Sequence, residues 1–263
     1  MKSAAFEYLR AATLAEAVAL LDGETRPFLG GQSLSPMMNL RLARPARLLD
    51  LKPLGLRDVA ADDQRFHIGA GHTHAAIEDV VFQDFSAGLL PHVARGIAYR
   101  GVRNRGTLGG ALAHADPAAD WLTVLLLLGG TVRTSARAIA AGDFCAGAYA
   151  TALGTSEILT GVDFPRLSAT ARWGWQKINR KRGAFADALG GAALDGGLAR
   201  VVVGAIEAPP LLLPDASAAL RDRGVEAAIA AARAECETLL PHLDADGRRL
   251  RAVAVTRALE RLR

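Results

Sequence analysis

The chain has 263 residues, of which 51% are hydrophobic, so it can bury a substantial core and is too apolar for a disordered protein. Its formal net charge of +4 comes from arginines spread along the chain, and only 5% of residues are aromatic, which excludes a basic nucleic-acid surface with stacking platforms. The two cysteines, Cys145 and Cys236, lack metal-ligand spacing, which predicts free thiols and a reducing, cytoplasmic setting.

Neither a signal peptide nor a membrane span is expected. Glu7 falls where a signal peptide would carry its apolar stretch. The longest apolar run, Trp121 to Gly130, is too short to cross a bilayer, because a transmembrane helix needs about 20 residues.

Residues 1–55 are predicted to form a first α/β lobe. Three short strands are expected, at residues 6–8, 26–29 and 47–51. A helix follows the first strand, since Thr13 can cap it and Glu16 completes a capping box. Pro36 stands where the first turn of a further helix tolerates a proline.

A second lobe is predicted over residues 56–165. Its expected strands are 65–71, 129–134 and 158–164, and its expected helices are 75–80, 89–98 and 118–128. Thr73 is placed to cap the first of these helices. The character of the sequence changes after Pro165, where a strand at 172–178 begins a smaller unit.

The unit over residues 166–263 is predicted to be a small α+β domain. Segments 184–194 and 199–206 are apolar enough for two buried strands, or for a helix and a strand. Two helices are expected at its end, over 225–239 and 248–262.

Two glycine-rich loops, residues 28–33 and 103–110, each combine two adjacent glycines with a hydroxyl residue, Ser33 or Thr107. Glycine permits close backbone approach, and consecutive amides can form a nest for anionic oxygens. The pair predicts a diphosphate held from two sides. No G-x-G-x-x-G follows the first strand, so a Rossmann site is not expected, and Ser33 lacks the G-x-S-x-G elbow of a hydrolase.

Three blocks of sequence carry a resemblance to a known family. They are Gly30–Leu34 with Pro36 and Arg41, Gly69–His74 with Ile77 and Glu78, and Arg103–Gly110 with Asp116–Asp120. In order and spacing they resemble the FAD-binding medium subunit of molybdenum hydroxylases, which include the carbon monoxide dehydrogenase flavoprotein and the flavin domain of xanthine dehydrogenase. The resemblance implies an α+β protein: a two-lobed FAD-binding domain of the PCMH type over 1–165, then a small C-terminal α+β domain over 166–263.

The resemblance also implies a set of FAD-binding residues, with no catalytic residue and no metal ligand on this chain. They are Leu29, Gly30, Gly31, Gln32, Ser33, Leu34, Thr107, Leu108, Gly109, Gly110, Ala111, His114, Asp120, Leu159 and Lys177. Asp120 matches a family carboxylate that binds the ribityl chain. Lys177 matches a lysine near the pyrimidine end of the flavin, where a cation favours the anionic reduced ring.

Simpler interpretations stay open for several of these residues. Asp120 could cap a helix or be solvated, and Lys177 could be an ordinary solvated lysine. Leu159, which matches a leucine beside the isoalloxazine, is equally compatible with a core strand. His114 could touch the ring or be polar surface.

Three further polar residues are predicted to have structural roles. Asp116 precedes a proline and is expected to shape its turn. His72 and His74 would face opposite sides of a strand, which disfavours a metal site, so capping or packing is expected.

The function implied by the resemblance is electron transfer within a molybdenum hydroxylase. Substrate would be oxidised on a large subunit with a molybdopterin cofactor, and electrons would pass through two [2Fe-2S] clusters of a small subunit to FAD on this chain. NAD⁺, oxygen or another acceptor would then take them. Two alternatives remain: a self-contained FAD-dependent oxidase or reductase, which the short segment after Pro165 disfavours, and a flavin-less interaction protein, which the two glycine loops disfavour.

Overall fold

The computed structural model describes residues 2–263. Its first lobe contains a parallel three-stranded sheet in the order β1-β3-β2. Its elements are β1 (Glu7–Arg10), α1 (Leu14–Ala19), β2 (Thr25–Phe28), α2 (Leu34–Asn39), β3 (Arg47–Asp50) and the short 3₁₀ turn η1 (Lys52–Leu54). The predicted cap at Thr13 is confirmed, since Glu16 N donates to Thr13 Oγ1 at 3.1 Å. The Glu16 carboxylate accepts from Ala12 N at 2.8 Å, one residue before the cap, so the return bond of a capping box is not made to Thr13 itself.

The central lobe is built on an antiparallel five-stranded sheet in the order β4-β5-β10-β6-β7. Its strands are β4 (Val59–Ala61), β5 (Arg65–Gly69), β6 (Thr131–Thr134), β7 (Ala138–Ala140) and β10 (Leu159–Pro165), with a separate hairpin of β8 (Cys145–Gly147) and β9 (Ala150–Thr151). Its helices are α3 (His74–Glu78), α4 (Leu89–Arg95), α5 (Arg100–Arg103), α6 (Leu108–His114), α7 (Asp120–Leu128) and α8 (Ala141–Phe144).

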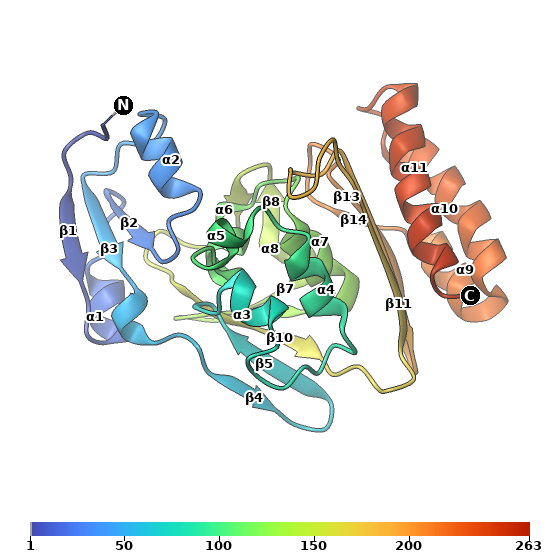
Figure 1. Ribbon diagram of the computed structural model, residues 1–263, viewed down its shortest axis with the longest axis horizontal. Coiled ribbons are helices and arrows are strands. Elements are labelled where there is room, and N and C mark those ends of the chain that lie inside the picture. Colours follow the sequence, from blue (N-terminus) through green and yellow to red (C-terminus); the bar gives the residue numbers. More distant parts are fainter. Residues whose placement is uncertain (1) are drawn as a thin grey trace.

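The C-terminal unit is an antiparallel four-stranded sheet covered by three helices, seen edge-on in Figure 1. The strands are β11 (Arg172–Ile178), β12 (Ala188–Asp195), β13 (Leu198–Gly204) and β14 (Leu211–Leu212), and the helices are α9 (Pro214–Arg223), α10 (Val225–Leu239) and α11 (Ala245–Glu260). Segments 184–194 and 199–206 therefore both supply strands. The helix alternative for one of them is wrong.

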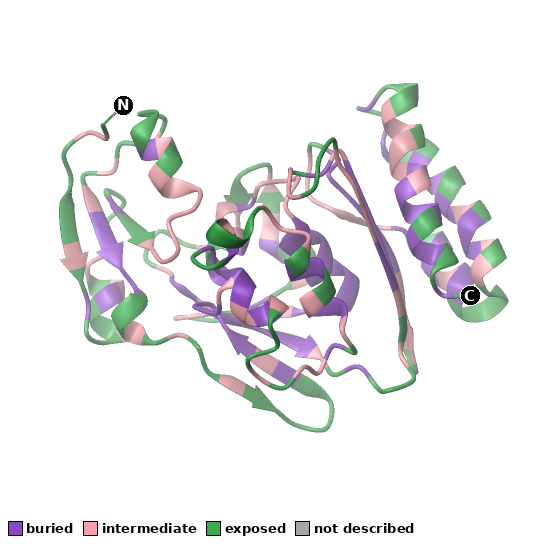
Figure 2. Ribbon diagram, viewed as in Figure 1, coloured by how far each residue is buried: buried purple, intermediate pink, exposed green. Residues whose placement is uncertain are grey.

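Helix α7 joins the central and C-terminal units. All nine of its residues are buried, and it packs on β12 and β13 on the side opposite to helices α9–α11 (Figure 2). Side chains on β13 alternate between two cores: Val202 lies in the one shared with α7, whereas Val201 and Val203 lie beneath the helices. The predicted boundary at residue 165 thus separates two sheets while the apolar core crosses it, and the domain division stays a prediction.

The described residues 2–263 include no helix with the length and apolar character needed to cross a membrane.

Candidate functional site

The first glycine loop presents a run of free backbone amides. It leaves the carboxyl end of β2, and Gly31 adopts a left-handed φ of +69°. Among residues 2–263, no acceptor is found for the N–H groups of Gly30, Gly31, Gln32 and Ser33. Consecutive amides without partners form a concave site for anionic oxygens, so this loop fits the predicted diphosphate.

The second glycine loop has already used the amides of Leu108, Gly109 and Gly110. Leu108 N donates to His72 O at 3.0 Å, Gly109 N to Ala70 O at 3.0 Å, and Gly110 N to Thr107 Oγ1 at 3.1 Å. The expectation of free amides is therefore wrong for residues 108–110, whereas Thr107 N has no acceptor among residues 2–263. Thr107 acts as the N-cap of α6, and because its oxygen accepts from Gly110, its hydroxyl hydrogen is left to donate elsewhere.

Gly109 is required for packing. A Cβ at this position would lie 2.5 Å from Ala70 Cβ, so only glycine lets α6 approach the end of β5. Neither Gly109 nor Gly110 has a positive φ. These glycines position the loop without forming an anion nest.

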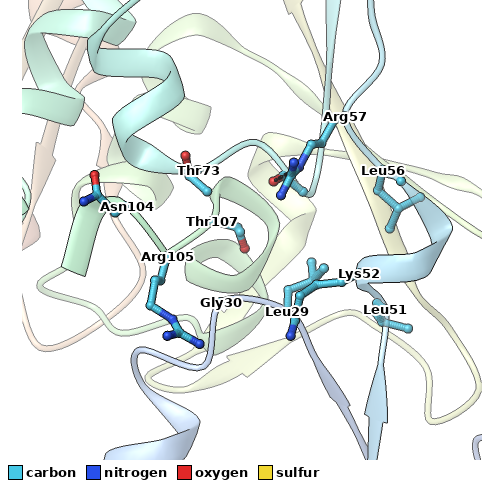
Figure 3. Close-up of a pocket in the computed structure, with 12 residues that line it drawn as sticks. Leu29, Gly30, Leu51, Lys52, Leu56, Arg57, Thr73, Asn104, Arg105 and Thr107 are labelled. Carbon is cyan, nitrogen blue, oxygen red and sulfur yellow. Dashed lines mark hydrogen bonds between the residues drawn. The ribbon is translucent and has the colours of Figure 1, made fainter. Parts of the chain in front are cut away.

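The two loops meet at the seam between the lobes. A Cβ on Gly30 would overlap the carbonyl oxygen of Arg105, which shows how closely the first loop abuts the second. Beside this contact lies a cavity of about 140 Å³ (Figure 3). Its lining comes from both lobes: Leu29, Gly30, Leu51, Lys52, Gly55, Leu56, Arg57, Gly71, Thr73, Asn104, Arg105 and Thr107.

The cavity is lined by three basic side chains, Lys52, Arg57 and Arg105, and by no carboxylate. Its volume is below the roughly 300–1,000 Å³ of pockets that enclose a whole small molecule. The cavity therefore suits an anionic portion of a larger ligand. None of these three cations was predicted from the sequence to belong to the site.

Buried Asp50 positions Lys52. Asp50 Oδ1 accepts from Lys52 N at 3.0 Å, Oδ2 lies 3.6 Å from Lys52 Nζ, and the Tyr8 hydroxyl donates to Oδ2 at 2.7 Å. Lys52 follows β3 at the same sheet edge as the first glycine loop. This placement at the carboxyl end of a parallel strand was a usable sequence signal.

Asp120 and Lys177 form a buried ion pair, with Lys177 Nζ 2.7 Å from Asp120 Oδ2. The Lys177 side chain is 11% exposed and the Asp120 side chain is 4% exposed. Both solvated interpretations are therefore wrong. Lys177 Nζ also donates to Gly96 O at 3.3 Å. Burial raises the pKa of Asp120 above the usual carboxyl value, and the Lys177 ammonium opposes that rise.

One oxygen of Asp120 is left over. Asp120 Oδ1 is buried and has no hydrogen-bond partner among the described residues. A buried acceptor without a partner is costly, so this atom fits a hydroxyl donor from a bound molecule.

The positions of the other predicted residues do not by themselves indicate a contact with a cofactor. Leu159 and Leu108 are buried in the core of the central lobe, as the core interpretation of Leu159 allowed. Half-buried His114 packs its ring 5.3 Å from that of Tyr149, and burial lowers the pKa of His114. Of the predicted set, only Leu29, Gly30 and Thr107 line the cavity; the rest do not: Gly31, Gln32, Ser33, Leu34, Leu108, Gly109, Gly110, Ala111, His114, Asp120, Leu159 and Lys177.

Asp116 has the predicted structural role. Asp116 Oδ1 accepts from Ala118 N at 2.9 Å, and the Tyr149 hydroxyl donates to Oδ2 at 3.2 Å. Thr73 caps α3, as predicted, since Ala76 N donates to its Oγ1 at 3.1 Å.

His72 and His74 are both buried, and each makes its own hydrogen bond. Trp121 Nε1 donates to His74 Nδ1 at 3.1 Å, and His72 Nε2 donates to Arg57 O at 2.8 Å. Burial lowers the pKa of His74 to about 4, so its ring is neutral near neutral pH. Within residues 2–263 no group of three or more His, Cys, Asp or Glu side chains is arranged to hold a metal ion.

Comparison with known proteins places this arrangement in one family. Residues 4–167 match the family described as FAD binding domain in molybdopterin dehydrogenase. The chain is 36% identical over 192 residues to the nicotine 6-hydroxylase medium subunit of Paenarthrobacter nicotinovorans, covering 70% of this chain and 67% of that protein. It is likewise 36% identical over 200 residues to the carbon monoxide dehydrogenase medium chain of Afipia carboxidovorans, covering 72% of this chain and 68% of that one.

Solved structures agree over the whole length. A chain of carbon monoxide dehydrogenase from Hydrogenophaga pseudoflava superposes with a TM-score of 0.88 at 31% identity, covering 100% of this chain and 98% of that chain. A chain of quinoline 2-oxidoreductase from Pseudomonas putida 86 gives 0.85 at 32% identity, covering 100% and 96%. The fold is therefore the predicted α+β fold of an FAD-binding protein, and this chain belongs to the family of FAD-binding subunits of molybdenum hydroxylases, which are oxidoreductase subunits.

Proposed function

We propose that this chain binds FAD at the seam between its first two lobes and passes electrons from the [2Fe-2S] clusters of a partner to an external acceptor. The observation that carries the proposal is the run of four free amides, Gly30–Ser33, beside a cavity lined by Lys52, Arg57 and Arg105. Amides and cations together suit a diphosphate, and FAD carries one.

The residues of this chain fit the cofactor at two points. The first loop and the three cations would hold the diphosphate. The unpartnered Asp120 Oδ1 would accept a hydrogen bond from a ribityl hydroxyl, which removes the cost of leaving it unpaired. Thr107 has a hydroxyl hydrogen free to donate at the same seam.

FAD, when bound, supplies the redox chemistry, and the chain's own residues bind and orient it. Lys177 would set the electrostatic environment of the ring from its fixed place beside Asp120. No proton transfer by a side chain is required for this role, so we assign no catalytic residue.

The partners follow from the relatives. Several are named medium subunits or medium chains, and the Hydrogenophaga pseudoflava structure is of an enzyme described as lacking the Mo-pyranopterin moiety of the molybdenum cofactor. We infer a large subunit with a molybdopterin cofactor and a small iron–sulfur subunit for this chain too. NAD⁺, oxygen or a comparable acceptor would receive the electrons, in a cytoplasmic complex.

Spectra of the flavin test the proposal. The purified chain should bind FAD, and acid precipitation should release all of it, since binding is by amides and charges. Substrate should reduce that FAD only after co-expression with the molybdenum and iron–sulfur subunits from the same source. Substrate turnover by the isolated chain would instead favour a self-contained flavoenzyme, and a colourless chain that takes up no FAD would favour an interaction protein.

A further inference from the structure

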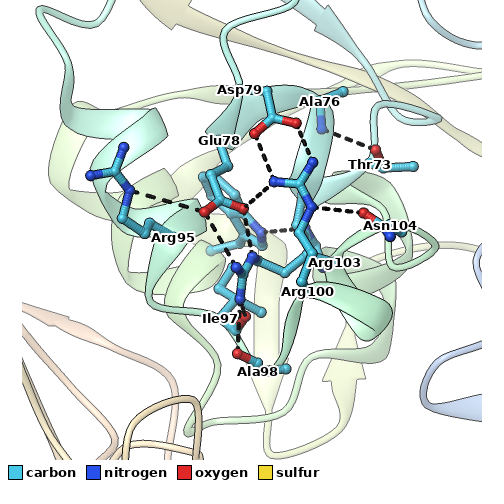
Figure 4. A network of polar contacts seen from close by, with 12 residues as sticks. Thr73, Ala76, Glu78, Asp79, Arg95, Ile97, Ala98, Arg100, Arg103 and Asn104 are labelled. Atoms are coloured by element: carbon cyan, nitrogen blue, oxygen red, sulfur yellow. Dashed lines mark hydrogen bonds and ion pairs between the residues drawn. The ribbon is translucent and has the colours of Figure 1, made fainter.

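Glu78 and Arg103 form a buried ion pair that the cavity and the cofactor contacts leave unexplained. Arg103 Nε and Nη2 donate to the two carboxylate oxygens of Glu78 at 2.7 and 3.2 Å (Figure 4). Arg103 is only 9% exposed as a residue, and the Glu78 side chain is 11% exposed. A bidentate pair removed from water is strong and fixes the orientation of both groups.

The third arm of Arg103 reaches a turn of the backbone. Its Nη1 donates to Ile97 O and to Ala98 O, both at 2.9 Å. Ala98 has a φ of +44°, a conformation that residues with a Cβ rarely adopt. The ion pair therefore holds in place a strained turn, residues 96–98, which directly follows α4 in the chain.

The same turn contacts the C-terminal unit twice. Gly96 O accepts from Lys177 Nζ at 3.3 Å, while Lys177 Nζ also binds Asp120. A Cβ on Gly183 would lie 2.6 Å from Ala98 O, so the β11–β12 loop packs directly on the turn. A shift of the turn would remove one of the two fixed contacts of the Lys177 ammonium.

We propose that Glu78 and Arg103 are positioning residues that fix the turn 96–98 so that its Gly96 carbonyl holds Lys177 against Asp120. The inference rests on the proposed function, because Lys177 and Asp120 are assigned there to the flavin. Arg100 offers a matched control. It also bonds Glu78, but it is about half exposed and makes no contact with the carbonyls of the turn.

The first test needs no cofactor. The cofactor-free full chain is treated with a small amine-acylating reagent, and the modification rates of Lys177 and of exposed Lys52 are measured by mass spectrometry. Arg103→Lys should raise the Lys177 rate relative to Lys52 by about tenfold, within the range of couplings inside one hydrogen-bond network. Glu78→Gln should do the same more weakly, and Arg100→Lys should match the wild type. An unchanged Lys177 rate in both folded variants would overturn the proposal.

The second test uses the FAD-loaded chain and its reduction potential. Arg103→Lys should shift the potential to more negative values, because the Lys177 cation that favours the reduced ring loses its fixed place. In a Lys177→Met background the same substitution should cause no shift. An equal shift in both backgrounds would show that Arg103 does not act through Lys177. A wild-type chain that binds no FAD would refute the proposed function, while the acylation result would still decide the positioning role.

Discussion

Buried titratable groups behind the glycine loops are held by specific partners. Asp120 meets Lys177 through one oxygen only, and neutral His74 accepts from Trp121, the residue next to Asp120. The hydrogen bond between His74 and Trp121 ties the start of α7 to the start of α3. The position of Asp120 is thus determined by two side chains that lie far away in the sequence.

Asp120→Asn should weaken FAD binding by about one to two decades, because a hydrogen bond to a charged group contributes about 1.5–3 kcal/mol. The single amide oxygen must face Lys177, which leaves an N–H where an acceptor is needed. Calorimetric titration of the cofactor-free chain measures the effect. Asp116→Asn is the control and should bind like the wild type, and a larger loss there would mean that the two acids are wrongly assigned. The double variant with Lys177→Met separates the lost acceptor from the unpaired lysine.

His74 should make stability depend on pH. Its pKa is about 4 in the folded chain, below the ordinary 6.5, so only the unfolded chain binds a proton between these values. The stability contributed by neutral His74 is therefore complete above pH 6.5 and is lost as the pH falls towards 4. Between about pH 7.5 and pH 5 the loss should be about 2 kcal/mol.

Urea unfolding at these two pH values measures this contribution as the difference between the wild type and His74→Gln. The wild type should lose more stability on acidification than the variant. Equal losses would show that His74 is not the group responsible.

At the scale of elements, patterns contained within one segment predicted the structure well. Helix α10 has the predicted bounds, and the caps at Thr13 and Thr73 are confirmed. Helix α9 was missed, although Pro214 at its first turn and buried residues at helical spacing gave a usable signal. The hydrogen bonds of the Leu108 and Gly109 amides could not be predicted, because their acceptors, His72 O and Ala70 O, lie on a different segment of the chain.

Gly109→Ala should destabilise the fold before it affects the cofactor. The new Cβ would meet Ala70 Cβ at 2.5 Å and force α6 away from β5. We expect a loss of about 1–3 kcal/mol in the free energy of unfolding, as for other overpacked sites.

Adding Ala70→Gly to Gly109→Ala removes one of the two colliding methyl groups and should restore part of the stability. Thermal unfolding of the single and double variants measures both effects. A Gly109→Ala variant with wild-type stability and lost FAD binding would instead support the prediction that this loop contacts the diphosphate.

At the scale of the whole molecule, the candidate site is a seam between lobes. Its cations come from separate places: Lys52 after β3, Arg57 in the connection between lobes, and Arg105 in the second loop. No local pattern brings all three together, so the sequence pointed to the first glycine loop and missed the cations beside it, although the place of Lys52 after β3 was recognisable. The family resemblance supplied Lys177 and Asp120, and the structure adds that they are paired with each other.

Gly30→Ala should abolish high-affinity FAD binding while each sheet stays folded. The new methyl group would overlap the carbonyl of Arg105, a backbone atom that cannot rotate away, so the first loop must move off the second. Separating the loops moves the free amides away from the cations of the cavity, and we expect the affinity for FAD to fall roughly a hundredfold or more.

Gly101→Ala is the matched control, because a Cβ there meets nothing within 4 Å and the position is helical. It should bind FAD normally and gain about 0.5–1 kcal/mol of stability. Calorimetric titration with FAD, together with far-UV circular dichroism, compares the two variants. Wild-type affinity in a folded Gly30→Ala variant would show that the close contact of the two loops is not needed to hold the diphosphate.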